Sequence, residues 1–152
     1  MKTIADILKG SSFFTDLSEN ELAFIAGCAS LVHFSEGKII ANHGDEANTF
    51  FLIREGNIAL SIEDKVGKPF LYETLGPLDI VGLSWLIPPY RRTASAIAQT
   101  EVKALSFNGR CIREKCEKDH SLGYKMMRHL LQLMVEREDA LKLHLLDIFG
   151  RR

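Results

Sequence analysis

Residues Leu75–Ala98 read LGPLDIVGLSWLIPPYRRTASAIA, and this segment is the most informative part of the chain. Its glycines and prolines predict a strand end, a turn, a short helical turn, a corner and a second strand. Gly82 has no Cβ, so the backbone there can approach a ligand closely, and N–H groups at the start of a helical turn are free to bind an anion. Arg92 follows ten residues later, with Thr93 beside it. A guanidinium and a hydroxyl beside free N–H groups suit a compact phosphate, although a buried strand-turn-strand with one surface arginine explains the same residues without a ligand.

On both sides of this segment, short apolar runs alternate with turn residues. The runs lie at residues 31–34, 38–41, 49–54, 58–62, 70–74 and 101–107. Gly37, Gly44 and Gly56 lie in the breaks between them. Short strands with a turn about every 8–12 residues are typical of an antiparallel sandwich or barrel. We therefore expect a mainly β fold with a β-roll at about residues 30–107.

Helical patterns flank the expected roll. Residues 3–8 can form one or two helical turns, and Ser18 with Glu21 forms a capping box that predicts the start of another helix. Asn108 can cap a short helix that begins at Gly109. The longest helical pattern begins near Ser121, so the helical C-terminal segment covers about residues 109–149.

The last helix carries more apolar surface than its own roll can cover. Its apolar residues recur at spacings of three and four, at Met127, Leu130, Leu131, Met134, Leu141, Leu145 and Ile148. At ~1.5 Å per residue it is roughly 40 Å long, which exceeds the body of a domain of this size. We therefore expect a homodimer that pairs through this helix. A helix that lies flat on its own roll, or that breaks near Arg137, is the alternative.

The order of these motifs resembles the cyclic nucleotide-binding domain family, which includes the bacterial catabolite activator and the regulatory subunits of cyclic-AMP-dependent kinases. Asp79, Gly82 and the run Arg92-Thr93-Ala94 match the family's phosphate-binding cassette. Upstream, the runs FSEGKII (34–40), GDEA (44–47) and FLIREGNI (51–58) also follow the family pattern. The resemblance covers most of residues 13–149. It implies a single domain over residues 1–152, with an antiparallel β-roll of the jelly-roll type, N-terminal helices and a long C-terminal helix.

The resemblance also implies a ligand site. Arg92, Thr93, Gly82 and Ser84 fall where the family binds the phosphate of cyclic AMP or cyclic GMP. Leu83 stands where the family has a glutamate for the ribose hydroxyl, and a leucine side chain can neither donate nor accept a hydrogen bond. The residues expected around the rest of the ligand are Leu83, Trp85, Tyr90, Glu136 and Arg137.

Composition bounds the function further. The chain has 152 residues and a net charge of −1, so it has no basic excess for nucleic acid. Its three cysteines are too few for a disulfide framework, which suits a reducing cytoplasm. No apolar run reaches the ~18 residues of a membrane span. No metal-ligand spacing and no nucleophile–base pair is readable. We therefore expect a cytoplasmic, non-enzymatic protein without a metal or a membrane segment.

Three functions remain open at this stage. The first is a sensor that binds a small phosphate-containing ligand and moves its C-terminal helix in response. The second is a degenerate, dimeric interaction module that binds no nucleotide, and Leu83 favours it. The third is the sensor half of a transcription regulator, if the chain is a piece of a longer protein. No helix-turn-helix pattern follows the last helix of this sequence, so we expect no direct DNA binding by it.

Overall fold

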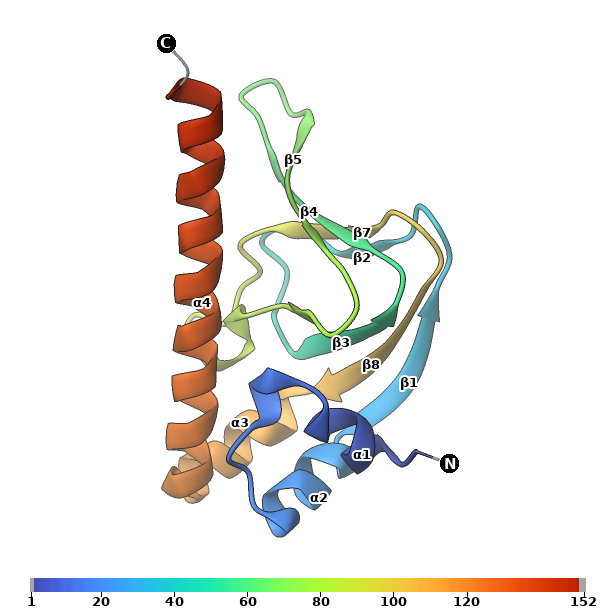
Figure 1. The fold of residues 1–152 in the computed structure, drawn as a ribbon, viewed down its shortest axis with the longest axis vertical. Helices are drawn as coiled ribbons and strands as arrows, with labels where there is room; N and C mark the ends of the chain where they lie inside the picture. The colour runs from blue at the N-terminus through green and yellow to red at the C-terminus, as the bar shows by residue number, and fades with distance from the viewer. Residues whose placement is uncertain (1, 151–152) are drawn as a thin grey trace.

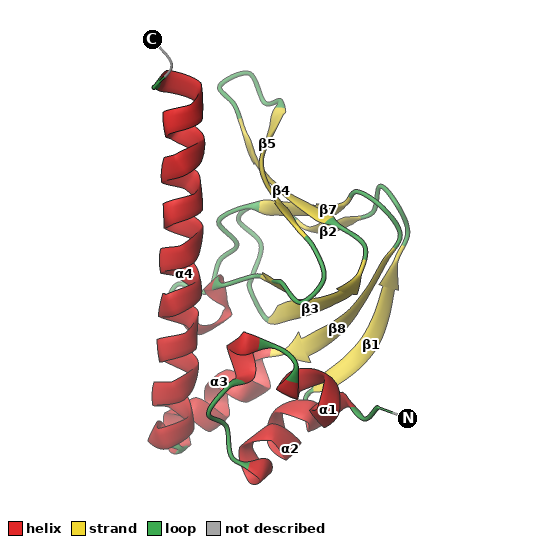
Figure 2. Ribbon diagram, viewed as in Figure 1, coloured by secondary structure: helices red, strands yellow, loops and turns green. Residues whose placement is uncertain are grey.

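In the computed structural model, which describes residues 2–150, eight strands form two antiparallel sheets that close into a β-roll (Figures 1 and 2). The first sheet contains, in spatial order, β1 (Ala29–Phe34), β8 (Val102–Asn108), β3 (Thr49–Glu55) and β6 (Ile80–Val81). The second contains β2 (Ile39–Ala41), β7 (Ser95–Ala98), β4 (Ile58–Glu63) and β5 (Pro69–Leu75). The predicted mainly β fold is confirmed, and strand ends differ from the predicted runs by one or two residues.

Strand β3 is buried on both faces, and its alternating side chains divide the core in two. Phe50 and Leu52 face the helices, whereas Phe51 and Ile53 face the space between the sheets. Successive side chains of a strand point to opposite faces, so one strand serves both clusters. On the helical side Phe50 stacks between Trp85 and Phe107, with ring centroids 4.6 and 4.5 Å away. This aromatic column connects the cassette segment to the sheet beneath it.

Helices cover one end and one side of the roll (Figure 2). They are α1 (Ile4–Lys9), the 3-10 turn η1 (Ser12–Phe14), α2 (Glu19–Gly27), the 3-10 turn η2 (Ser84–Leu86), α3 (Gly109–Lys118) and α4 (His120–Phe149). Helix α4 is continuous over 30 residues, so the alternative of a break near Arg137 is wrong. Figure 1 shows its C-terminal turns reaching about as far as the β4–β5 hairpin and past the other strands of the roll.

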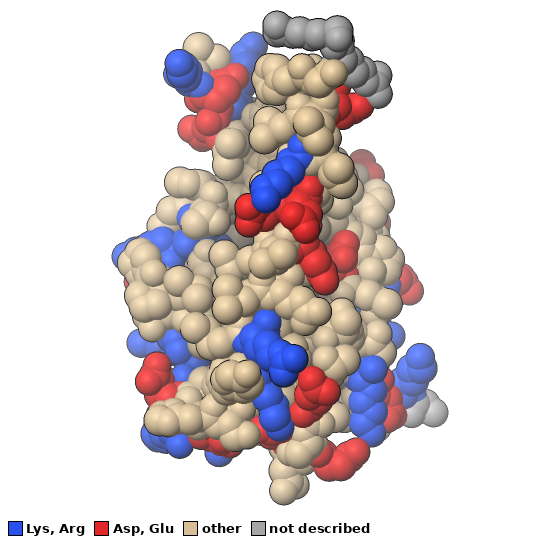
Figure 3. All heavy atoms as spheres, turned by 60° about the vertical axis from the view of Figure 1, so that its left-hand side comes forward, with Lys and Arg blue, Asp and Glu red and all other residues tan. Residues whose placement is uncertain are grey.

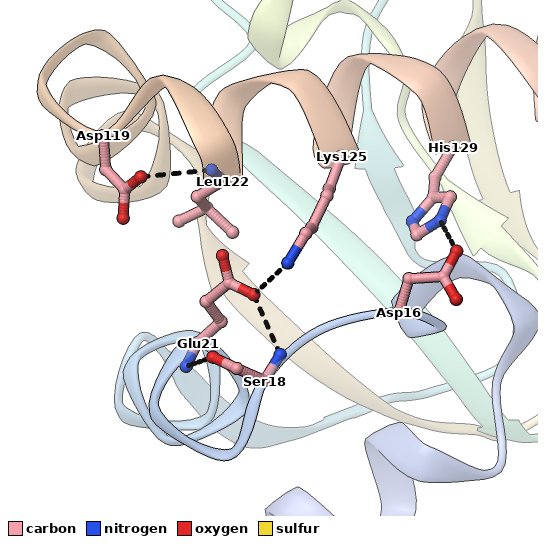
Figure 4. Close-up of polar contacts among 7 residues, drawn as sticks. All are labelled: Asp16, Ser18, Glu21, Asp119, Leu122, Lys125 and His129. Atoms are coloured by element: carbon pink, nitrogen blue, oxygen red, sulfur yellow. Dashed lines mark hydrogen bonds and ion pairs between the residues drawn. The ribbon is translucent and has the colours of Figure 1, made fainter.

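Polar contacts hold the N-terminal helices against the start of α4 (Figure 4). The predicted capping box is present, because the Ser18 hydroxyl accepts from the Glu21 N–H and the Glu21 carboxylate accepts from the Ser18 N–H. The same carboxylate accepts a hydrogen bond of 2.7 Å from the Nζ of Lys125. Asp119 caps the first turn of α4 by accepting from the Leu122 N–H. The start of α4 is therefore tied to α2 through the Glu21–Lys125 contact.

The carboxylate of Glu21 is expected to make the fold sensitive to acid. Hydrogen bonds from Lys125 and from the Ser18 N–H hold the pKa of Glu21 below its usual value of 4.5. A carboxylate whose pKa is depressed in the folded state stabilises that state above pH ~4.5, and this contribution is lost as the pH falls through the folded-state pKa. The variant Glu21→Gln should lower the free energy of unfolding by about 1–3 kcal/mol at pH 7. The loss should shrink towards pH 3.

Urea unfolding at pH 7 and pH 3 measures this difference. Glu19→Gln is the matched control, because Glu19 lies in the same helical turn with 86% of its side chain exposed, and its 3.4 Å ion pair to Lys9 lies at the surface. Surface ion pairs contribute about 0–1 kcal/mol, so this control should change little. An equal loss in both variants at pH 7, or a Glu21→Gln loss that is the same at both pH values, would contradict the expectation.

Candidate functional site

A cavity of about 260 Å³ lies between the cassette segment, strand β5 and helix α4. The structure brings six of the predicted site residues together in its lining: Gly82, Leu83, Ser84, Arg92, Thr93 and Arg137. Tyr72 and Glu73 of β5 and Met134 and Leu141 of α4 complete much of the remaining wall. The cavity therefore has a polar end at the cassette and a mixed apolar and charged end beneath α4.

The guanidinium of Arg92 is inside the protein and not in bulk solvent. Arg92 is only 9% exposed, and its Nη2 donates to the Thr49 hydroxyl over 2.8 Å. Two backbone hydrogen bonds of 2.8 Å fix the main chain, from the Arg92 N–H to the Asp45 carbonyl and from the Gly44 N–H to the Arg92 carbonyl. Burial lowers the pKa of Arg92, while the nearby Asp45 raises it. A guanidinium keeps its charge despite such burial, so this cation is held ready for an anionic partner.

Gly82 faces this guanidinium at very short range. Its φ angle is +97°, in the region that favours glycine, and a Cβ at this position would lie 2.6 Å from Nη1 of Arg92. Only a residue without a side chain allows the two groups to approach so closely. The turn η2 begins just after Leu83, which makes no side-chain capping hydrogen bond. The N–H groups at the start of this turn are therefore uncapped by Leu83 and lie beside the cation.

The other end of the cavity is shaped by a cation from α4. The Nη2 of Arg137 donates to the carbonyl of Ile80, at the edge of the first sheet. Burial lowers the pKa of Arg137, and Glu73 and Asp79 raise it. Burial likewise raises the pKa of Glu73, while Arg137 lowers it. A guanidinium and a carboxylate that interact electrostatically thus line the cavity together with Leu83.

Three residues predicted to surround the ligand lie elsewhere, and the sequence-based assignment is corrected for them. Trp85 is fully buried in the aromatic column of the core. Tyr90 lies under the guanidinium of Arg113, 3.9 Å from its ring centroid, and lines a different cavity. Glu136 is an exposed residue of α4 that borders a third cavity, beside His129. One residue along a helix is a turn of about 100°, so Glu136 and Arg137 cannot face the same wall.

Sequence reasoning missed several residues that build the site. Glu73 and Tyr72 lie on a strand that the periodicity predicted, but nothing in a local pattern shows that this strand faces α4. Thr49 accepts a hydrogen bond from Arg92, and the charge of Asp45 raises the pKa of Arg92. Both residues lie about 45 positions earlier in the chain. The turn at Gly44-Asp45 could have pointed to these residues, because it belongs to the run GDEA (44–47) that follows the family pattern. Its role as the support of Arg92 was not visible from spacing alone.

The described residues contain free thiols but no cluster of metal ligands and no helix that could cross a membrane. Between residues 2 and 150, no group of three His, Cys, Asp or Glu side chains is placed to hold a metal ion. The Sγ atoms of Cys28 and Cys111 lie 3.7 Å apart as free thiols, far from the cassette in the sequence. No helix among the described residues is long and apolar enough to cross a membrane.

Comparisons with known proteins identify a family for this chain and several relatives. The family model described as "Cyclic nucleotide-binding domain" matches residues 31–119. A CRP-like cAMP-activated global transcriptional regulator of Mycobacterium tuberculosis is 23% identical over 125 residues, which cover 82% of this chain and 56% of the regulator. A cGMP-dependent protein kinase of Drosophila melanogaster is 31% identical over 98 residues, which cover 63% of this chain and 10% of the kinase. The chain thus spans about half of one relative's length and a tenth of the other's.

A solved structure agrees over nearly the whole chain. A cyclic nucleotide-binding protein described as putative, from Geobacter metallireducens, superimposes with a TM-score of 0.81 and 28% identity. The match covers 90% of this chain and 98% of that one. The β-roll spans only residues 29–108, so the similarity extends beyond it into the flanking helices.

Proposed function

Because the chain belongs to the cyclic nucleotide-binding domain family, we propose that it is a regulatory sensor whose cavity binds a small phosphate-containing ligand, a cyclic nucleotide such as cyclic AMP or cyclic GMP. The observation that carries the proposal is the buried guanidinium of Arg92, which faces Gly82 inside the cavity. A buried cation without a carboxylate ion pair is costly unless an anion joins it. The ligand phosphate supplies that anion.

Different residues of the cavity would contact the phosphate, the sugar and the base of such a ligand. The phosphate pairs with Arg92 and accepts hydrogen bonds from the N–H groups of Ser84 and Thr93. The carboxylate of Glu73 lines the same cavity and can accept from a sugar hydroxyl, which Leu83 cannot do. The base then packs against Met134 and Leu141 under α4. Twelve of the sixteen lining residues come from the roll and four from α4, so ligand binding and the position of the helix are coupled.

Helix α4 acts as the moving part in this proposal. Arg137 closes the cavity by binding the Ile80 carbonyl, and a ligand that competes for this cation shifts the helix between two positions. Hydrogen exchange of the α4 amides should therefore change when ligand is added. Amides of β3 and β8, which are buried on both faces, serve as the internal control.

Isothermal titration calorimetry with cyclic AMP and cyclic GMP tests the proposal. Saturable heat with either nucleotide supports the sensor. The second candidate is an interaction module that binds no nucleotide, and it is favoured by Leu83 and by a volume of about 260 Å³, below the ~300 Å³ at which ligand sites usually begin. The absence of heat with both nucleotides, from a sample whose unfolding is cooperative, would establish that module and overturn the sensor.

We further propose that the partner of α4 is a second copy of this chain. Large apolar side chains remain exposed along its C-terminal half, at Leu141, Leu143, Leu145, Leu146, Ile148 and Phe149. Figure 3 turns the side that carries α4 towards the viewer, and uncharged surface predominates there between scattered charges. A 30-residue helix is about 45 Å long, enough for a paired helical seam. A net charge of −1 gives this pair no electrostatic reason to bind DNA directly.

Sedimentation measurements test the dimer. The variant Leu145→Glu should dissociate it, because two copies of a carboxylate would be buried at the seam. Leu31→Glu is the matched control, since Leu31 is 65% exposed on β1, away from α4. A wild-type protein that remains monomeric at concentrations near 100 μM, well above ordinary dimer affinities, would refute the pairing.

A further inference from the structure

We propose that a second cavity, lined by three arginines beside the cassette loop, is a separate binding site for a compact phosphate-type dianion. This arginine cavity has a volume of about 170 Å³ and is lined by Arg91, Arg110 and Arg113 together with Glu46, Asn48, Pro89 and Tyr90. It shares no lining residue with the cavity that contains Arg92. Its volume is well below the ~300 Å³ of a typical site for a whole small molecule, so it suits a single phosphoryl group.

One of the three cations is already held in place. The Nη1 of Arg113 donates to the Trp85 carbonyl over 2.5 Å, and the guanidinium carbon lies 3.9 Å from the centroid of the Tyr90 ring. The carbonyl anchors one edge of the guanidinium and the ring covers one face, so the remaining donors keep a defined direction. A preorganised guanidinium loses little freedom when an anion binds to it.

The other two arginines lie at the surface and share the cavity with a single carboxylate. Arg91 and Arg110 are exposed, and neither forms an ion pair with any residue in the 2–150 range. Glu46 is the carboxylate in the lining, and its Oε2 accepts from the Nδ2 of Asn48 over 3.1 Å. Three arginines against one carboxylate leave the cavity with an excess of positive charge, which a bound dianion would neutralise.

The position of Arg110 adds a second argument. It lies in the first turn of α3, a ten-residue helix whose first turn contains no acidic residue. A cation at a helix N-terminus opposes the helix dipole, whereas an anion there is stabilised by it. The N–H groups of Gly109 and Cys111 already donate to the Asn48 carbonyl and to the Asn108 side chain. An anion held by Arg110 near this end would therefore gain from the helix dipole and not from free N–H groups.

The backbone explains how neighbouring arginines serve two different cavities. Arg91 forms an isolated antiparallel bridge with Glu46, and successive residues of an extended segment point to opposite sides. Arg91 thus lines the arginine cavity and Arg92 the larger one. Hydrogen bonds of 2.8 Å from the Ala47 N–H to the Tyr90 carbonyl and from the Arg92 N–H to the Asp45 carbonyl hold the segment between them.

Calorimetric titration of the full chain with inorganic phosphate, against sodium chloride of equal ionic strength, tests the proposal. Arg110→Gln and Arg91→Gln should each weaken phosphate binding about tenfold, because each removes one charge-assisted contact. Arg54→Gln, at an exposed arginine on β3, is the matched control and should change the affinity less than about twofold. Both test positions are exposed, and an unchanged unfolding midpoint would verify that the variants fold.

Arg92→Gln separates this site from the proposed nucleotide site. Phosphate affinity that survives Arg92→Gln and falls in Arg110→Gln supports the arginine cavity. Affinity that is lost in Arg92→Gln and kept in Arg110→Gln and Arg91→Gln places phosphate in the larger cavity and overturns the proposal, as does the absence of saturable heat. A parallel titration with glycerol phosphate distinguishes the two sources of the dianion, the free ion and a phosphate monoester.

Discussion

Replacing Arg92 by glutamine is expected to weaken cyclic nucleotide binding at least about a hundredfold, which corresponds to about 2.7 kcal/mol. Glutamine is shorter and uncharged, so the ligand phosphate would be buried without its counter-charge. The cost of leaving a charged group buried and unpaired is the largest single loss that a side-chain change can impose on such a site. Calorimetry with the nucleotide that binds the unmodified protein measures the change.

Two further variants test whether the loss is specific to the charge and shape of Arg92. Arg91→Gln removes the neighbouring arginine, which is exposed and lies outside the nucleotide cavity, and should leave nucleotide affinity within about twofold in phosphate-free buffer. Arg92→Lys keeps the charge but loses the forked geometry, and should give an intermediate loss of about tenfold. Nucleotide binding by Arg92→Gln with unchanged affinity would show that the phosphate is bound elsewhere, and the proposed site would have to be abandoned.

Replacing Trp85 by alanine is expected to lower the free energy of unfolding by about 3–5 kcal/mol. The ring is fully buried, stacks on Phe50 at 4.6 Å and continues a column that reaches Phe107. Its removal takes a large apolar surface out of the core and leaves a cavity that the rigid strands beneath cannot close. Urea unfolding followed by circular dichroism measures the loss.

The matched variant Trp85→Phe separates the core role from contact with a ligand. It keeps an aromatic ring in the column and removes the indole Nε1, which is buried and has no hydrogen-bond partner among the described residues. We expect a stability loss below about 1.5 kcal/mol and a nucleotide affinity within about twofold of the unmodified protein. A strong affinity loss in Trp85→Phe with stability retained would instead indicate that the ring contacts the ligand, as the sequence-based assignment held.

Local patterns predicted the elements of this fold well. The capping box at Ser18, the cap at Asn108 and the strand predicted at residues 49–54 depend on side chains within a few positions of each other. All are present, the strand as β3 (Thr49–Glu55). The placement of Trp85 and Tyr90 failed for the opposite reason. Both lie close to Arg92 in sequence, and proximity along the chain was taken as proximity in space. The turn η2 directs Trp85 into the core, and the bridge at Arg91 leaves Tyr90 beside Arg113 on the other side of the loop.

From its residues alone, the chain already specified the β-roll, the long final helix and the glycine–arginine pair at the cassette, because periodicity, turn residues and caps act over short distances. Which side chains surround the cavity was settled only by the tertiary structure. Glu73 of β5, Gly82 of the cassette segment and Arg137 of α4 come from three separate segments and line one cavity, and Thr49 of β3 holds Arg92 beside them. Contacts of this kind depend on how both hydrophobic cores pack, and a local sequence pattern carries no information about that packing.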